Sequence, residues 1–579
     1  MKKALIIILS AVLLGGIGGG LYYFFFWKNL SGQIVVPYIA HQKPRIDPHI
    51  PASVPLADKM DEVVFDGLFN VSANPSGITY EDGLGELMGL TEDNVVSIRL
   101  KPARKWHSSY GITMEKDKIT RIAENQAVGF TAKDLNFTLR RIQQLGSRSP
   151  DYILVNQAVE GFTFSGPDEN DEIQFKFRQD RIWTESDIKE VLSFKILPAT
   201  SDLNAPIYNE GTGPYMRAGE YEDVIYYYKN LDGTANIASL VLKPYIDNST
   251  FTTEIKNKNI NSLLSTPFGA VSPILADSTK FFHKSNVSTT FFAVLYNFQR
   301  LNLQQRIELR KLLNHERIME RFFKIGTEQQ RHISDYRGNR DNYEDYLNYS
   351  MFPTSSYYVD EEIVIPNRGY DYPDLTVLPD TVRIQTCVNY GFREELQELV
   401  TIMNDPGLFK GKVKVEAVQN EVIRQGNYDA VLIAVSGYRS NFLFDLYDLF
   451  LREPDFAVKK INLVTGTNRD GQRVVMDESF TAAKNFLRID LAESDERYEN
   501  KKKLLDYIYG FMSTHEVGDK QAYAQFIDEL DQEIALGSWL FSLPSLAYFR
   551  TQFEEHSISL YGVASQLSTV EQWKEKPSL

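Results

Sequence analysis

Alternation of apolar and polar side chains predicts short strands in several parts of the chain. Apolar residues stand at every second position in residues 95–100 (VVSIRL) and 173–177 (IQFKF), and residues 225–228 (IYYY) are a third β-favouring run. A period of two is typical of a strand that buries one face and exposes the other. These segments are therefore predicted to be strands of sheets with one covered face.

Between these strands, apolar residues recur at intervals typical of a helix. Thr131 is a favourable N-cap residue, and Asp134 three positions later can complete a capping box. Apolar residues then recur at helical spacing at Leu135, Leu139 and Ile142. The sequence thus predicts a helix that begins after Thr131 and buries one face.

Segments later in the chain are also predicted to form both helices and strands. A further helix is predicted to begin near Asn302 and to run through apolar positions as far as Phe323. Residues 521–535 are also predicted to be helical, and residues 539–544 (WLFSLP) are predicted to form a buried strand closed by proline. Strands and helices interspersed along the whole chain favour an α/β architecture.

The first residues have a different pattern. Residues 4–27 carry no charge, end in an aromatic cluster, and are flanked by Lys2, Lys3 and Lys28. As a helix this segment would span about 36 Å, enough to cross a bilayer. A cleaved signal peptide is the alternative, but its apolar core is shorter and ends in a small-x-small site. We expect a single-pass anchor in the cytoplasmic membrane, with the bulk of the chain on the extracytoplasmic, periplasmic side.

Composition narrows the class of protein. The chain has 579 residues, 43% of them hydrophobic and 24% charged, which indicates a folded protein of about three or four domains, or of one large multi-lobed domain. Its 62 basic and 77 acidic residues give a net charge of −15, so nucleic acid is not an expected partner. The single cysteine, Cys387, excludes an intramolecular disulfide and a cysteine-rich metal cluster, and it is too far from the N-terminus to carry a lipid anchor.

Enzymatic motifs are incomplete in this sequence. Ala434 replaces the first glycine of a G-x-S-x-G motif around Ser436, and Met319 replaces the second histidine of a zinc-protease motif that begins at His315. The eight histidines are scattered along the chain. We therefore predict no catalytic residues, no metal and no cofactor. A glycosidase pair of catalytic carboxylates stays open as an alternative, because its two members can be far apart in the sequence.

Six groups of motifs occur in order along the chain. They are RIDPH with FDGLF (45–49 and 65–69), NVVSIRLKPARKWH (94–107), FTAKDLNFTL (130–139), GTGPY (211–215), YN with the helix around Arg306 (296–314), and YDA (428–430). Together they resemble the extracytoplasmic solute-binding proteins of peptide and nickel ABC transporters, the bacterial family 5 binding proteins. The resemblance extends over most of the chain.

The resemblance implies a fold and its boundaries. The implied fold is a two-lobed periplasmic-binding-protein-like α/β fold (type II, cluster C-like), with an inserted subdomain in the first lobe. The N-terminal transmembrane helix is added from the apolar pattern of residues 4–27 and not from the resemblance. The expected segments are an anchor (1–27), a tether (28–43), three parts of the first lobe (44–75, 200–285 and 540–579), the insert (76–199) and the second lobe (286–539). Trp106 is expected in the core of the insert.

Three departures from the family pattern stand out. Twenty-two residues separate His107 from Phe130, so an extra loop or hairpin is predicted there. A membrane helix stands in place of the usual lipid or cleaved signal. The loop after residue 434 has no acidic residue before Asp445, where peptide-binding members often place an aspartate, and Arg439 puts a cation there instead.

The resemblance also implies candidate ligand-binding residues. They are Ser436, Tyr438, Arg439 and Asn441 in one cleft loop, Asn389, Tyr390 and Arg393 after a strand, and His49 near the mouth between the lobes. Arg439 favours a ligand that presents an anionic or neutral polar group, because a free ammonium there would face a like charge.

The implied function is capture of a peptide-like or small polar solute for the permease of an ABC importer. The alternative is an envelope sensor or scaffold that keeps the binding fold but takes no part in transport.

Overall fold

The computed structural model describes residues 30–50, 55–74, 77–101, 105–146, 149–165, 172–179, 183–264, 275, 277–313, 315–324, 347–348, 350–352, 372–386, 393–417, 428–435, 465–467, 473–475, 491–514, 517–560 and 566–577. Among them, no helix is both long and apolar enough to cross a membrane. The predicted anchor lies outside the described residues.

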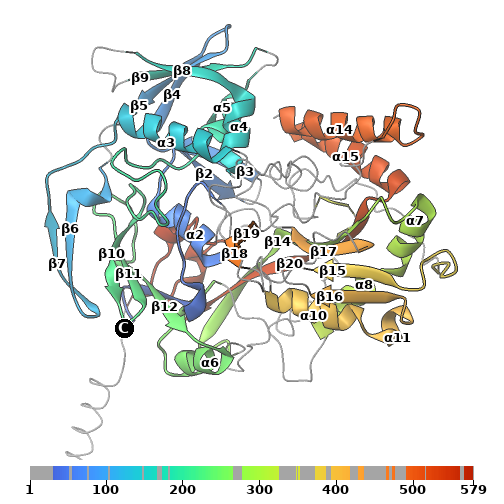
Figure 1. Cartoon of the computed structure of the whole chain (residues 1–579). Coiled ribbons are helices and arrows are strands. Elements are labelled where there is room, and N and C mark those ends of the chain that lie inside the picture. Colours follow the sequence, from blue (N-terminus) through green and yellow to red (C-terminus); the bar gives the residue numbers. More distant parts are fainter. Residues whose placement is uncertain are drawn as a thin grey trace, which may run out of the picture.

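The first lobe is built on a four-stranded sheet of order β1-β12-β11-β10 (Figure 1). Its strands are β1 (Gln33–Ile39), β10 (Tyr215–Tyr221), β11 (Val224–Lys229) and β12 (Ser239–Tyr245). Helix α2 (Pro55–Val64) packs into the same core, together with Phe553 and Trp573 from the end of the chain. Segments from both ends of the sequence thus share one core. Helix α6 (Asn248–Lys256) packs in a smaller apolar cluster beside it.

The insert has an antiparallel sheet of order β4-β5-β9-β8. Its strands are β4 (Gly85–Leu90), β5 (Val95–Leu100), β8 (Val159–Ser165) and β9 (Glu172–Phe177), and its helices are α3 (Ala132–Leu145), α4 (Pro150–Ala158) and α5 (Glu185–Val191). A hairpin of β2 (Phe69–Asn74) and β3 (Gly77–Asp82) adjoins them. Trp106 is buried in this core, as predicted.

Two features of the insert confirm local predictions. Thr131 and Asp134 form a capping box at the start of α3, so orphan amides of the first turn are satisfied as the sequence indicates. The extra residues between His107 and Phe130 form a hairpin of β6 (Tyr110–Glu115) and β7 (Lys118–Glu124). Ile112 pairs with Ile122 across this hairpin.

The second lobe contains most of a six-stranded sheet of order β13-β20-β14-β17-β15-β16. The strands are β13 (Ser262–Leu263), β14 (Phe281–Tyr296), β15 (Val382–Thr386), β16 (Val413–Ala417), β17 (Ala430–Val435) and β20 (Gly537–Arg550). The helices are α7 (Leu303–Leu312), α8 (His315–Lys324), α10 (Arg393–Met403), α11 (Pro406–Phe409), α14 (Tyr498–Ser513) and α15 (Val517–Ile534). A short pair, β18 (Thr465–Thr467) and β19 (Arg473–Val475), is separate.

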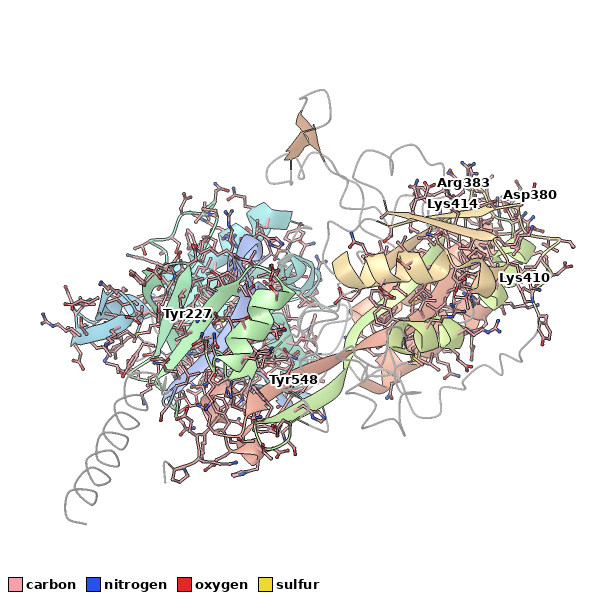
Figure 2. The ribbon with its side chains drawn as sticks, turned by 90° about the horizontal axis from the view of Figure 1, so that it is seen from below. Tyr227, Asp380, Arg383, Lys410, Lys414 and Tyr548 are labelled. Carbon is pink, nitrogen blue, oxygen red and sulfur yellow. The ribbon has the colours of Figure 1, made fainter. Side chains whose placement is uncertain are left out.

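Two long strands, β14 and β20, connect the lobes, and we call them the crossing strands. Strand β20 contributes Trp539 to the second-lobe core and Phe549 to the first-lobe core. The two strands pair antiparallel along most of their length, from Phe281 opposite Arg550 to Leu295 opposite Gly537. Figure 2 shows Tyr548 at the first-lobe end of this connection. The fold is therefore two-lobed.

Two local predictions were wrong in detail. The helix expected from Asn302 to Phe323 is two helices, because α7 ends at Leu312 and α8 begins at His315. The strand expected to close at Pro544 continues to Arg550. On its outer side β20 pairs with β13 at its far end and forms a single bridge from Phe541 to Leu347. Among the described residues no strand pairs with Pro544 on that side, and such an edge position tolerates a missing amide.

Candidate functional site

The candidate site lies where two parallel strands of the second lobe end. Strands β15 and β17 are parallel neighbours, with Ile384 opposite Ala430. Their carboxyl ends therefore meet at one edge of the sheet, the edge at which open α/β sheets bind ligands. The predicted residues Asn389, Tyr390, Ser436, Tyr438, Arg439 and Asn441 follow these strands in sequence and lie outside the described residues. Arg393 is the first residue of α10. Their ligand contacts stay predictions.

Two polar residues at the end of β15 add to this candidate site. Gln385 is 4% exposed and Thr386 is fully buried. Among the described residues, the Gln385 Oε1 and Thr386 Oγ1 atoms have no hydrogen-bond partner. A buried polar oxygen needs a partner, so these two atoms are candidates to meet a neighbouring loop or a solute. The sequence pattern gives no signal for them, because burial of a polar side chain within a strand depends on tertiary packing.

The opposite end of the same strands is fixed by Asp429, from the YDA motif. Arg300 donates from Nε to Asp429 Oδ1 at 2.7 Å, and the Arg383 backbone amide donates to Oδ2 at 2.8 Å. The Asp429 amide in turn donates to the Arg383 carbonyl at 2.8 Å. The carboxylate therefore locks the starts of β15 and β17 together, which positions their far ends.

His49 lies in a buried network of the first lobe. It is 0% exposed. Its Nε2 lies 2.7 Å from the Lys195 carbonyl, which can only accept, so Nε2 carries the proton. Arg141 Nη1 lies 2.6 Å from the other ring nitrogen, Nδ1, and donates to it. Both ring nitrogens are thus used by protein groups, and the ligand contact predicted for His49 stays a prediction that this arrangement does not favour.

The same network explains the RIDPH motif. Arg141 of α3 is 2% exposed and donates from Nη2 to Asp47 Oδ2 at 2.7 Å and from Nε to Tyr208 Oη at 2.9 Å. Lys195 lies beside it and donates from Nζ to Glu62 at 2.9 Å. Burying charged groups is favourable only when they are paired and hydrogen-bonded, as these are. The network joins the insert to the first lobe.

The GTGPY motif forms a close backbone contact. A Cβ atom on Gly211 would lie 1.9 Å from the Val64 carbonyl oxygen, so only glycine fits there. The Thr212 hydroxyl donates to Asp66 Oδ2 at 2.9 Å, and His107 donates from Nε2 to the Gly213 carbonyl at 2.9 Å. Burial lowers the pKa of His107 to about 4, so this ring is neutral near pH 7.

A second buried cluster supports the crossing strand β20. Asp531 accepts from Arg310 Nη2 at 2.7 Å, from the Leu536 amide at 2.9 Å and from Trp539 Nε1 at 2.8 Å. Arg306, from the motif around residues 296–314, donates to the Ile534 carbonyl at 2.9 Å. These contacts hold α15 and the start of β20 against α7.

Two surface hollows are lined by described residues. One, of about 380 Å³, is lined by the first-lobe residues Tyr208, Glu210 and Arg217 and their neighbours. The other, of about 510 Å³, is lined by Arg300, Asp380, Arg383 and their neighbours in the second lobe. Figure 2 shows Asp380 and Arg383 at the outer end of that lobe, away from Tyr548. Neither hollow is lined by residues of both lobes, so neither is an interlobe site.

Comparison with known proteins identifies the fold. No family model and no curated protein sequence matches the chain. Solved structures match 94% of it: NikZ from Campylobacter jejuni, in complex with Ni(L-His), has a TM-score of 0.63 at 15% identity over 100% of that chain. A dipeptide binding protein from a Pseudoalteromonas species has a TM-score of 0.62 at 13% identity over 100% of its chain. The oligopeptide-binding protein AppA from Bacillus subtilis has a TM-score of 0.60 at 13% identity over 99% of its chain.

The class of fold is thus that of the two-lobed solute-binding proteins. The resemblance to family 5 binding proteins, predicted from six motifs, is confirmed at the level of the fold. At these identities the likeness carries the architecture, and the solute has to be inferred from the chain itself.

Proposed function

We propose that this chain is an extracytoplasmic solute-binding protein that captures a peptide-like or small polar solute between its lobes for an ABC importer. We further propose that residues 1–27 tether it to the cytoplasmic membrane as a single-pass anchor. It acts as a binding protein, not as an enzyme.

The observation that carries this proposal is the pair of α/β cores connected by the two crossing strands. Two bodies joined in this way can close around a ligand by a change confined to the connection. Parallel strands β15 and β17 end at one edge of the sheet, and the predicted ligand residues follow these strands in the sequence. The structural relatives support the class of solute, since they were solved with Ni(L-His), with Met-Leu and with a nonapeptide.

The first experiment identifies the solute. Protein purified from its native membrane under mild conditions should carry a small polar or peptide-like molecule, which denaturation releases for mass spectrometry. The released molecule, added back to stripped protein, should bind with one-to-one stoichiometry in calorimetry. Protein that repeatedly yields no such molecule, and binds none from a peptide library, would contradict the proposal.

The charge of the solute is tested at Arg439. Because this residue places a cation in a loop without an acid, we expect N-acetylated peptides to bind better than peptides with a free amino terminus. Arg439→Asp should reverse that order, and Arg439→Ala should reduce the preference. Equal binding of both peptide forms by all three proteins would remove Arg439 from the site.

Uptake separates transport from sensing. Deletion of the coding sequence should abolish accumulation of the labelled solute, and the wild-type chain should restore it. Normal uptake in the deletion strain, together with tight binding by the purified protein, would favour the sensor or scaffold role.

A further inference from the structure

The insert and the first lobe form one body. Phe137 of α3 packs into the first-lobe core, while Leu135 of the same helix packs into the insert core. Arg141, also in α3, forms an ion pair with Asp47 of the first lobe. A helix shared by two cores and held by a buried ion pair leaves little room for relative motion.

The second lobe is joined to that body in a different way. The crossing strands β14 and β20 run from one core to the other and supply the covalent connection. Closure of two lobes is usually absorbed by a few residues of such a connection. Any other contact between the insert and the second lobe must therefore form or break when the lobes move.

Helix α4 of the insert makes such a contact. Leu154 packs against the second-lobe core, Val155 packs against the core of the insert, and Tyr152 packs against both. All three side chains are partly buried. Neighbouring positions of one short helix are thus divided between the two bodies.

We propose that α4 is an interlobe latch, in which Tyr152 and Leu154 hold the second lobe against the insert and set the balance between closed and open forms. Opening would return the apolar surface of these side chains to water, which favours the closed form. Loss of the Leu154 contact should shift that balance toward the open form by about tenfold, the effect expected for partial exposure of one leucine.

The latch would act on solute binding without touching the solute. Apparent affinity scales with the fraction of protein in the competent form, so a weaker latch lowers affinity by the same factor as it lowers that fraction. This consequence rests on the proposed function, whereas the latch itself is a property of the free protein.

The test measures the distance between the lobes in the full chain, in detergent and without solute. Spin labels are placed on cysteines that replace Glu92 in the insert and Gln397 in the second lobe, both exposed, in a background with Cys387→Ser. Pulsed electron double resonance then gives the distribution of distances. Leu154→Ala is compared with Val155→Ala, which removes a similar apolar group from the same helix at a side chain that packs, among the described residues, against the insert core and not the second-lobe core.

Leu154→Ala should add or enlarge a population at longer distance, and Tyr152→Ala combined with it should enlarge that population further. Val155→Ala should leave the distribution unchanged, and Leu154→Met, which keeps the volume, should restore it. Circular dichroism checks that each variant is folded. A wild-type distribution in folded Leu154→Ala, or an equal shift in Val155→Ala, would overturn the latch. Because no solute is present, either result leaves the proposed function untouched.

Discussion

Acid should destabilise the contact between the insert and the first lobe through His107, whose Nε2 donates to the Gly213 carbonyl. This ring is buried, and burial lowers its pKa from 6.5 to about 4. Above pH 6.5 neither the folded nor the unfolded protein protonates His107, so its contribution to stability does not vary. Between pH 6.5 and about 4 the unfolded chain binds a proton that the folded chain refuses, and the free energy of unfolding falls as pH falls.

The size of the effect follows from the pKa shift. Each pH unit inside this window costs about 1.4 kcal/mol, so His107 alone should remove about 2 kcal/mol between pH 7 and pH 5. His107→Gln keeps a donor for the Gly213 carbonyl but cannot titrate. Other ionisable groups contribute equally to both proteins, so the difference between the two pH dependences isolates the ring.

Urea unfolding followed by tryptophan fluorescence measures this difference. The wild-type protein should lose about 2 kcal/mol more than His107→Gln between pH 7 and pH 5. Trp106 is the adjacent residue and is buried in the insert, so the signal includes the relevant part of the molecule. Equal losses in the two proteins would show that the folded state accepts the proton and would refute the reasoning.

Three further predictions concern packing, charge and the N-terminus. Gly211→Ala should lower the free energy of unfolding in urea by more than about 3 kcal/mol, because the new Cβ would collide with the Val64 carbonyl. The control is Gly89→Ala, whose new Cβ meets nothing within 4 Å. It should change the free energy of unfolding by less than about 1 kcal/mol. Asp531→Ala should cost about 3–5 kcal/mol, because it leaves the largely buried Arg310 without its carboxylate partner and removes the acceptor of Trp539 Nε1. A loss below about 1 kcal/mol in thermal or urea unfolding would mean that the pair is not maintained in solution. If residues 4–27 stay attached, the mature protein should keep residue 1 and remain with membranes after high-salt washing; N-terminal sequencing that begins after Trp27 would contradict the anchor.

Local structure was largely predictable because its signals lie within a few residues. The capping box of Thr131 with Asp134 and the alternation in residues 95–100 both depend on neighbours in sequence, and both are found in the structure. The six family motifs, found in the expected order, predicted the two-lobed fold, which no single motif could support.

Long-range partners were not predictable in the same way. Asp47 belongs to a recognisable motif, but nothing in that motif points to Arg141, which is far away in sequence and reaches it only through the packing of α3. Helix α7 also ends at Leu312 where the apolar spacing alone suggested continuation. Gln385 and Thr386 could not be recognised from the sequence, because burial of a polar residue depends on tertiary packing.

The crossing strands also determine when this protein can fold. The core of the first lobe contains Ile34 near the beginning of the chain and Phe549, Phe553 and Trp573 near its end. Strand β14 likewise gains its long partner only when β20 has been made. Such non-local pairing forms late in synthesis, because the first lobe lacks part of its interior until Phe549, Phe553 and Trp573 have been added. We therefore expect the core of the first lobe to stay incomplete in any nascent chain that has not yet reached Trp573.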